Sequence, residues 1–280
     1  MSQNKWLLGM GMGFGRGDVP AAERLEYIAS AGFDATFCGW DPDKGLSDTA
    51  RLIRKSGLIL QSVHAPFNTV DRMWKRGTAG DEVLNMLCRC LDDCAEYGAP
   101  VMVSHVWIGF GRQRPTKIGV ERFARLLDHA AACGVRVAFE NTEGEKYLEL
   151  IRNELFSHSA AGFCIDTGHE MCYNHSEDMI SKYGADGKLI ATHINDNLGI
   201  TGNSITWLDD AHLLPFDGVG DWQGVADRLS AVGYEGILMS ELTVKSKPDR
   251  HTHDIYADLD CEGFVRLAYE RMSRLAKLIK

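Results

Sequence analysis

The feature that most constrains the fold is an alternation of short apolar runs with amphipathic helical patterns, repeated eight times along the chain. The apolar runs lie at residues 6–12, 34–40, 58–64, 101–107, 135–140, 161–166, 189–193 and 236–241. The helical patterns lie at residues 18–32, 46–56, 78–97, 117–133, 146–155, 177–183, 222–232 and 264–278. Runs of this length predict strands buried on both faces, and strands that alternate with helices pair in parallel. Eight such units predict an α/β fold, a closed (β/α)8 TIM barrel.

The chain length fits one barrel. The protein has 280 residues, of which 45% are hydrophobic, and no linker or low-complexity segment divides the sequence. A (β/α)8 barrel needs about 250 residues. We therefore expect a single domain over residues 1–280.

Composition also bears on the surroundings of the protein. No apolar run approaches the length needed to cross a bilayer, and the eight cysteines form no C-x-x-C pair. We therefore expect a cytoplasmic protein with no membrane partner, in which the cysteines are reduced and serve as small buried hydrophobes. The formal net charge of −9 opposes contact with a phosphate backbone, so we expect no nucleic-acid partner. The sequence leaves homo-oligomerisation open.

Metal-binding side chains stand at the carboxyl ends of four predicted strands. They are Glu140, Asp166, His193 and Glu241. In a barrel these strand ends converge on one mouth, where active sites lie. Carboxylates are rarely buried unless they are paired or bound to a metal. This set of oxygen and nitrogen donors suits a divalent cation such as Mn²⁺, Mg²⁺, Co²⁺, Fe²⁺ or Zn²⁺, and it does not choose among them.

Histidines gather at the same predicted mouth. Four of them fall at or just after predicted strand ends: His64, His105, His169 and His212. A lone core histidine usually binds nothing, but this set, together with Asp210, predicts a functional site. Three others are interpreted as ordinary surface residues: His129, His158 and His175.

Seven short motifs follow one another along the chain. They are H-A-P-F at His64, S-H-V at His105, F-E-N at Glu140, I-D-T-G-H at Asp166, H-I-N-D-N at His193, D-A-H-L-L-P-F-D-G-V-G-D-W at Asp210 and S-E-L at Glu241. In their order and over nearly the whole chain they resemble the xylose-isomerase-like barrels. This family includes sugar isomerases and epimerases, inosose dehydratases and endonuclease IV.

The resemblance to the epimerase branch implies a metal-dependent sugar isomerase or epimerase that acts on a keto-sugar or related polyol. The cation would be held by Glu140, Asp166, His193 and Glu241. Glu140 and Glu241 would also be catalytic, one removing the proton α to a metal-bound carbonyl and the other returning it from the far side. The substrate would be contacted by His64, His105, His169 and Trp107. For Trp107 the sequence leaves two roles open, stacking on a sugar ring or packing against other aromatic side chains.

Two other reactions remain as alternatives within the same resemblance. One is an inosose-type dehydratase or lyase. The other is an endonuclease IV-like zinc phosphodiesterase, in which three zinc ions would be held by the four residues of the metal set together with His64, His105, His169, Asp210 and His212. The acidic net charge argues against the second, because a duplex-DNA enzyme needs a rim rich in Lys and Arg.

Overall fold

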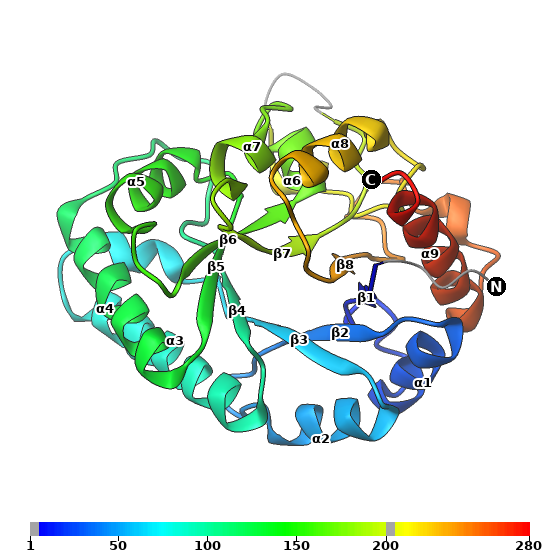
Figure 1. The fold of residues 1–280 in the computed structure, drawn as a ribbon, viewed down its shortest axis with the longest axis horizontal. Coiled ribbons are helices and arrows are strands. Elements are labelled where there is room, and N and C mark those ends of the chain that lie inside the picture. The colour runs from blue at the N-terminus through cyan, green and yellow to red at the C-terminus, as the bar shows by residue number, and fades with distance from the viewer. Residues whose placement is uncertain (1–5, 200–204) are drawn as a thin grey trace.

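The barrel predicted from the sequence is present in the computed structural model, which describes residues 6–199 and 205–280. Residues 200–204, in the loop predicted after the seventh strand, lie outside the described residues. One parallel sheet has the strand order β7-β6-β5-β4-β3-β2-β1-β8 (Figure 1). Its strands are β1 (Leu8–Met10), β2 (Ala35–Gly39), β3 (Ile59–His64), β4 (Val101–Ser104), β5 (Arg136–Glu140), β6 (Ala161–Asp166), β7 (Leu189–His193) and β8 (Leu238–Ser240).

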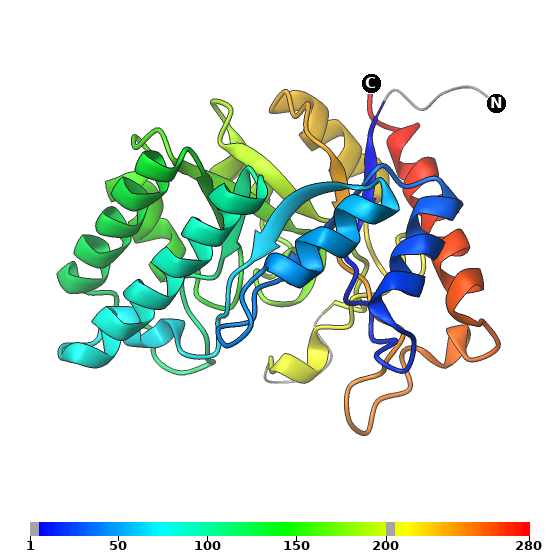
Figure 2. The same ribbon diagram turned by 90° about the horizontal axis from the view of Figure 1, so that it is seen from below.

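The helices form a ring outside the sheet (Figure 1). They are α1 (Ala21–Ala31), α2 (Ser47–Ser56), α3 (Thr78–Tyr97), α4 (Lys117–Cys133), α5 (Glu145–Leu155), α6 (Thr167–Cys172), α7 (Met179–Gly184), α8 (Trp222–Ala231) and α9 (Cys261–Ala276). Short 3-10 turns are η1 (Val70–Trp74), η2 (Trp207–Asp209) and η3 (Asp254–Tyr256). Figure 2 shows the loops that follow β7 and β8, in yellow and orange, projecting on one side, with the C-terminus on the opposite side. None of the described helices is long and apolar enough to span a membrane.

The barrel closes between β7 and β8 just beyond the end of β7. The Ile194 amide donates to the Met239 carbonyl at 2.8 Å, and the Ile194 carbonyl accepts from the Glu241 amide at 3.2 Å. The Met239 amide also donates to the Thr192 hydroxyl at 2.9 Å. This short ladder brings the end of β7 next to the end of β8, so His193 and Glu241 become neighbours.

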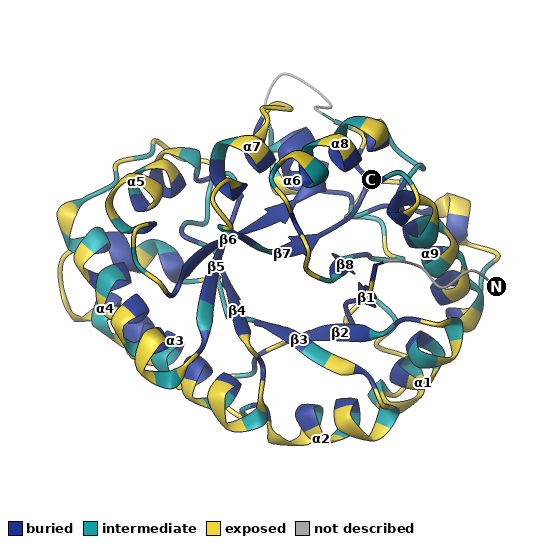
Figure 3. Cartoon of the chain, in the orientation of Figure 1, coloured by how far each residue is buried: buried dark blue, intermediate teal, exposed yellow. Residues whose placement is uncertain are grey.

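Small side chains fill the barrel below the mouth. Ala138, Cys164 and Ala191 belong to a buried cluster that is separate from the main core between sheet and helices. Strand side chains alternate between the two faces, so the residue two positions later also points into the barrel. Those residues are Glu140, Asp166 and His193. Figure 3 shows the strands as mostly buried and the outer faces of the helices as exposed. The apolar interior therefore ends in a layer of ionisable groups.

Candidate metal and active site

Glu140, at the end of β5, lies at the centre of the mouth and is fully buried. Its Oε1 atom is 3.0 Å from His193 Nδ1, and its Oε2 atom is 3.2 Å from the Nε2 atoms of both His64 and His105. Burial acts to raise the pKa of Glu140, but these imidazoles outweigh it and lower the pKa well below its usual range. The carboxylate is therefore anionic at neutral pH.

Asp166, at the end of β6, is held in place by two asparagines. Its backbone amide donates to Asn141 Oδ1 at 2.7 Å, and its Oδ2 atom accepts from Asn195 Nδ2 at 2.8 Å. Its Oδ1 atom accepts from the His169 amide at 2.7 Å, which caps the short helix α6. Burial raises the pKa of Asp166 to about 6 in the metal-free protein.

His193, at the end of β7, lies between the two glutamates. Its Nδ1 atom is 3.0 Å from Glu140 Oε1 and 2.8 Å from Glu241 Oε2, and its ring stacks on Phe37 with centroids 4.7 Å apart. Burial acts to lower the pKa of His193, but the nearby acidic groups raise it well above its usual value. The His193 Nδ1 atom thus lies between the Glu140 and Glu241 carboxylates, and a divalent cation could bind the same two carboxylates.

Three histidines are oriented by the same kind of hydrogen bond, from Nδ1 to a backbone carbonyl, so that Nε2 faces the mouth. The Nδ1 atoms of His64, His169 and His212 are 2.8–3.0 Å from the backbone carbonyl oxygens of Ala65, Asn141 and Glu241, respectively. A carbonyl only accepts, so each Nδ1 carries the proton and donates it. This fixes the tautomer and leaves the Nε2 lone pair for a metal or a proton, an arrangement that is usual for histidine ligands.

Asp210 and His212 extend the cluster beyond β7. Asp210 Oδ2 is 3.0 Å from His212 Nε2 and 3.7 Å from His169 Nε2, whereas its buried Oδ1 atom has no hydrogen-bond partner within the described residues. Burial acts to raise the pKa of Asp210, but the two imidazoles lower it well below its usual range. A buried, charged and unpaired oxygen is costly unless a ligand or cation completes it.

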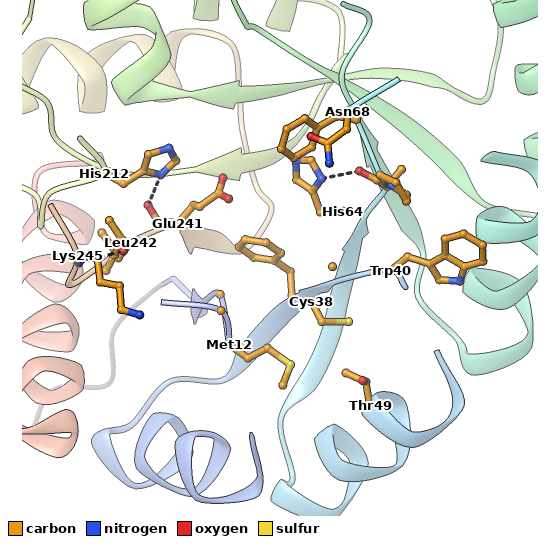
Figure 4. A pocket seen from close by; sticks show the side chains of 18 of the residues that line it. Met12, Cys38, Trp40, Thr49, His64, Asn68, His212, Glu241, Leu242 and Lys245 are labelled. Carbon is orange, nitrogen blue, oxygen red and sulfur yellow. Dashed lines mark hydrogen bonds between the residues drawn. The ribbon is translucent and has the colours of Figure 1, made fainter. Parts of the chain in front are cut away.

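Two adjoining cavities open at this mouth. One of about 450 Å³ lies over Glu140 and is walled by aromatic residues that include Phe110, Tyr173 and Trp207. The other, of about 890 Å³, lies beside the ends of β1, β2 and β3. Glu241 and His64 border both cavities. Figure 4 shows these two residues, together with His212, on one side of the larger cavity. Volumes in this range suit small organic molecules.

The residues fit a divalent cation. Glu140, Asp166, His193 and Glu241 each offer a ligand atom, and these atoms all lie within 4.8 Å of one another. Two overlapping sets meet the same limit: His64 with Glu140 and His193, and Asp166 with His169 and His212. The mouth therefore has ligands for more than one cation, and the mixed oxygen and nitrogen donors suit Mn²⁺, Mg²⁺, Co²⁺ or Zn²⁺.

The structure brings every predicted site residue to this mouth except the side chain of Trp107. The Trp107 indole stacks on Tyr147 with centroids 4.1 Å apart and donates to the Gly109 carbonyl at 2.7 Å. It is not among the residues that line either cavity. Of the two roles that the sequence leaves open for this side chain, the geometry favours aromatic packing.

Sequence reasoning missed the residues that orient the ligands. Asn141 and Asn195 position Asp166, and Phe37 supports the His193 ring. The only signal for the asparagines was their position, one residue after Glu140 and two residues after His193. Nothing in the sequence singled out Phe37, because its role depends on a contact between β2 and β7.

Comparison with known proteins agrees with this fold. A curated relative, the uncharacterized protein y4fM of Sinorhizobium fredii, is 30% identical, with 78% of this chain and 79% of that protein covered. The solved structure of a D-psicose 3-epimerase with D-tagatose, from Clostridium cellulolyticum, superposes with a TM-score of 0.69 at 16% identity, covering 95% and 97% of the two chains. That of an L-ribulose 3-epimerase superposes with a TM-score of 0.70 at 16% identity, covering 96% and 94%.

The two solved structures, at such low identity, show the fold alone. The family is shown by a sequence model described as xylose isomerase-like TIM barrel, which matches residues 25–259 and so covers most of the chain. This match spans all the predicted metal ligands. The protein belongs to the xylose isomerase-like TIM barrel family.

Proposed function

We propose that this protein is a divalent-metal-dependent isomerase or epimerase that acts on a keto-sugar or a related polyol. The observation that carries the proposal is the pair of glutamates, Glu140 and Glu241. Each contacts the same nitrogen of His193, and both border the cavity of about 450 Å³. The two epimerases that share this fold lend it further support.

The proposed cofactor is a divalent cation held by Glu140, Asp166, His193 and Glu241. When bound, such a cation supplies Lewis-acid polarisation of a carbonyl and stabilises the negative charge that develops on its oxygen. Asn141 holds the Asp166 backbone, and Asn195 keeps the Asp166 carboxylate in a fixed orientation. The protein thus supplies a ligand set that needs little rearrangement on binding.

Proton transfer is assigned to the two carboxylates. Burial acts to raise the pKa of Glu241, but His193 and His212 lower it to about 2, so Glu241 is anionic at neutral pH, as is Glu140. A carboxylate beside the α-carbon of a carbonyl compound can remove its proton, and a second one across the substrate can return it. Return to the opposite face inverts a stereocentre, and return to the neighbouring carbon gives an isomer.

The Glu140 carboxylate has a route for the proton it would accept. His64 Nε2 and His105 Nε2 both lie 3.2 Å from its Oε2 atom, and both histidines border the cavity. Either imidazole can exchange a proton with the carboxylate or hydrogen-bond a substrate hydroxyl. We assign substrate contact to these two residues and to His169.

The second candidate is a zinc phosphodiesterase of the endonuclease IV kind. It is favoured by the inward-facing Nε2 atoms of His64, His169 and His212 and by the unpaired Asp210 oxygen, which offer ligands for additional cations. The net charge of −9 argues against a duplex-DNA substrate. Cleavage of a duplex with an abasic site would establish this activity.

The test of the proposed function is solvent-deuterium incorporation. Metal-stripped protein is loaded with Mn²⁺, Co²⁺, Mg²⁺ or Zn²⁺ and incubated in heavy water with a panel of ketoses and inososes. We expect deuterium at the carbon next to the carbonyl together with an epimer or isomer, only when metal is present. Loss of water from the substrate would indicate a dehydratase, and absence of exchange with every metal and every substrate would contradict the proposal.

A further inference from the structure

The two cysteines that are not buried lie on two neighbouring helices of the outer ring, α3 and α4. Six of the eight cysteines are buried, as the sequence predicts, but Cys88 on α3 and Cys133 on α4 are partly exposed. The expectation that all eight serve as buried hydrophobes is therefore wrong for these two. The Cys133 thiol lies beside one carboxylate, Asp92, which also contacts the His129 imidazole, and Cys88 lies about one helical turn before Asp92 on α3.

The four side chains come from matched positions on two packed helices. Cys88 and Asp92 are four residues apart on α3, and His129 and Cys133 are four residues apart on α4. Residues at this spacing share one helix face. Asp92 on α3 therefore meets His129 and Cys133 on α4.

The distances describe a compact set. Asp92 Oδ1 is 2.7 Å from His129 Nε2 and accepts a hydrogen bond from Cys133 Sγ at 3.6 Å. The ligand atoms of Asp92, His129 and Cys133 all lie within 4.8 Å of one another, and Cys88 is not part of this set.

We propose that Asp92, His129 and Cys133 form a metal site of the zinc class that joins α3 to α4, with water in the fourth position. One sulfur, one imidazole nitrogen and one carboxylate oxygen, completed by water, make up a donor set that suits tetrahedral Zn²⁺. On binding, the Cys133 thiol releases its proton to solvent.

An ordinary surface ion pair accounts for part of this cluster but not for all of it. The Asp92 and His129 side chains are 58% and 35% exposed, and such a pair on its own contributes little to stability. It gives no reason for the partly exposed Cys133 thiol to join the same carboxylate. Free thiols at the surface are a liability through oxidation, whereas a bound metal protects them.

The proposed site is distinct from the barrel mouth. None of its three residues borders either cavity described above. A cation there would cross-link two helices of the outer ring and stabilise the fold. It would not contact a substrate in those cavities.

Cobalt provides the test, because only a thiolate ligand gives a near-ultraviolet sulfur-to-cobalt charge-transfer absorption. Reduced, metal-stripped full-length protein is titrated with Co²⁺, and Zn²⁺ is then added to displace it. We expect the natural chain to develop this absorption with one equivalent of bound Co²⁺ and to lose it on addition of Zn²⁺. The variant Cys133→Ser should lose that equivalent together with its absorption, while Co²⁺ without the thiolate band still binds at the mouth. Cys88→Ser, the matched control, should keep the absorption.

Two single variants compare the effect of a carboxylate inside the cluster with that of an exposed carboxylate outside it. Asp92→Asn should weaken the thiolate-bound Co²⁺ by at least about tenfold, as loss of a ligand does. Asp128→Asn removes an exposed carboxylate of α4 that pairs with His158 instead, and it should leave the affinity unchanged. A natural chain without the absorption, or an undiminished absorption in Cys133→Ser, would overturn the proposal.

Discussion

Two fully buried carboxylates at the same mouth of the barrel, Asp196 and Glu140, have opposite kinds of neighbours. Asp196 accepts five N–H groups at 2.8–3.0 Å, four from the backbone and one from the Trp222 indole. Glu140 instead faces the nitrogens of His64, His105 and His193. The donors to Asp196 cannot lose their protons at ordinary pH, whereas imidazoles can exchange protons and bind metals.

The comparison teaches that a strand-end acid is not a catalytic residue by position alone. Asp196 ties the loop that leads to α8 onto the end of β7, because its donors include the amides of Phe216, Gly218 and Gly220. At Gly218 an added Cβ would lie 2.1 Å from the Asn197 carbonyl oxygen, so only glycine allows this approach. We therefore infer a structural role for Asp196, whereas the role proposed for Glu140 is metal binding and proton transfer.

The largest expected effect is on the chemical side of this comparison. Glu140→Gln or Glu241→Gln removes a carboxylate that must accept a proton, and we expect turnover to fall about 10³-fold. Glu154→Gln, an exposed site on α5, is the matched control and should be silent. The measurement is turnover on the substrate that exchanges deuterium. Near-normal turnover in either site variant would contradict the two-carboxylate mechanism.

The next largest effect is expected on stability, when Asp196 is replaced. Asp196→Ala leaves five N–H groups, two buried and three partly buried, without their acceptor, and we expect the free energy of unfolding to fall by about 3–5 kcal/mol. Urea unfolding followed by circular dichroism measures this. If Asp196→Ala unfolded at the same urea concentration as the natural chain, the structural role of Asp196 would be wrong.

The pH dependence of metal binding sharpens the same contrast. In the metal-free protein the raised pKa of His193 keeps its imidazole protonated at neutral pH, and a cation must displace that proton. Metal affinity should therefore rise with pH, by about tenfold per pH unit for each proton released. Burial raises the pKa of Asp166 to about 6, so the dependence should steepen below that pH. Titration calorimetry with Mn²⁺ or Zn²⁺ measures this dependence.

Asp196→Asn provides the control for this pH experiment. Asp196 has no imidazole neighbour among its hydrogen-bond partners, so the variant should leave the slope unchanged. A metal affinity that did not change with pH in the natural chain would mean that His193 is not a ligand.

The smallest expected effect on activity is that of Trp107→Leu. The indole packs on Tyr147 behind the cavity wall, so kcat/KM should change by less than about threefold, or ~0.6 kcal/mol, while the free energy of unfolding falls. Phe67→Leu, at a position that borders both cavities, is the comparison and should raise KM more. A rise in KM for Trp107→Leu equal to that of Phe67→Leu would indicate instead that Trp107 contacts the substrate.

Much of the fold could be predicted because its signals are local. The observed ranges of α3 and α4 equal the predicted ranges 78–97 and 117–133, since each has amphipathic periodicity and ends at a glycine in the left-handed region, Gly98 and Gly134. The short helix α6 was not predicted, because it follows β6 directly and no loop in the sequence marks its start.

The sequence by itself determined the eight-unit barrel and the acidic and imidazole groups at its strand ends, because alternation along a strand and periodicity along a helix are properties of neighbouring residues. Only the tertiary structure decided the partners of those groups: five N–H donors for Asp196, imidazoles for Glu140, and Tyr147 for Trp107. It also brought Asp92 next to His129 and Cys133. These contacts join residues far apart in the chain, and the packing of the whole barrel fixes them.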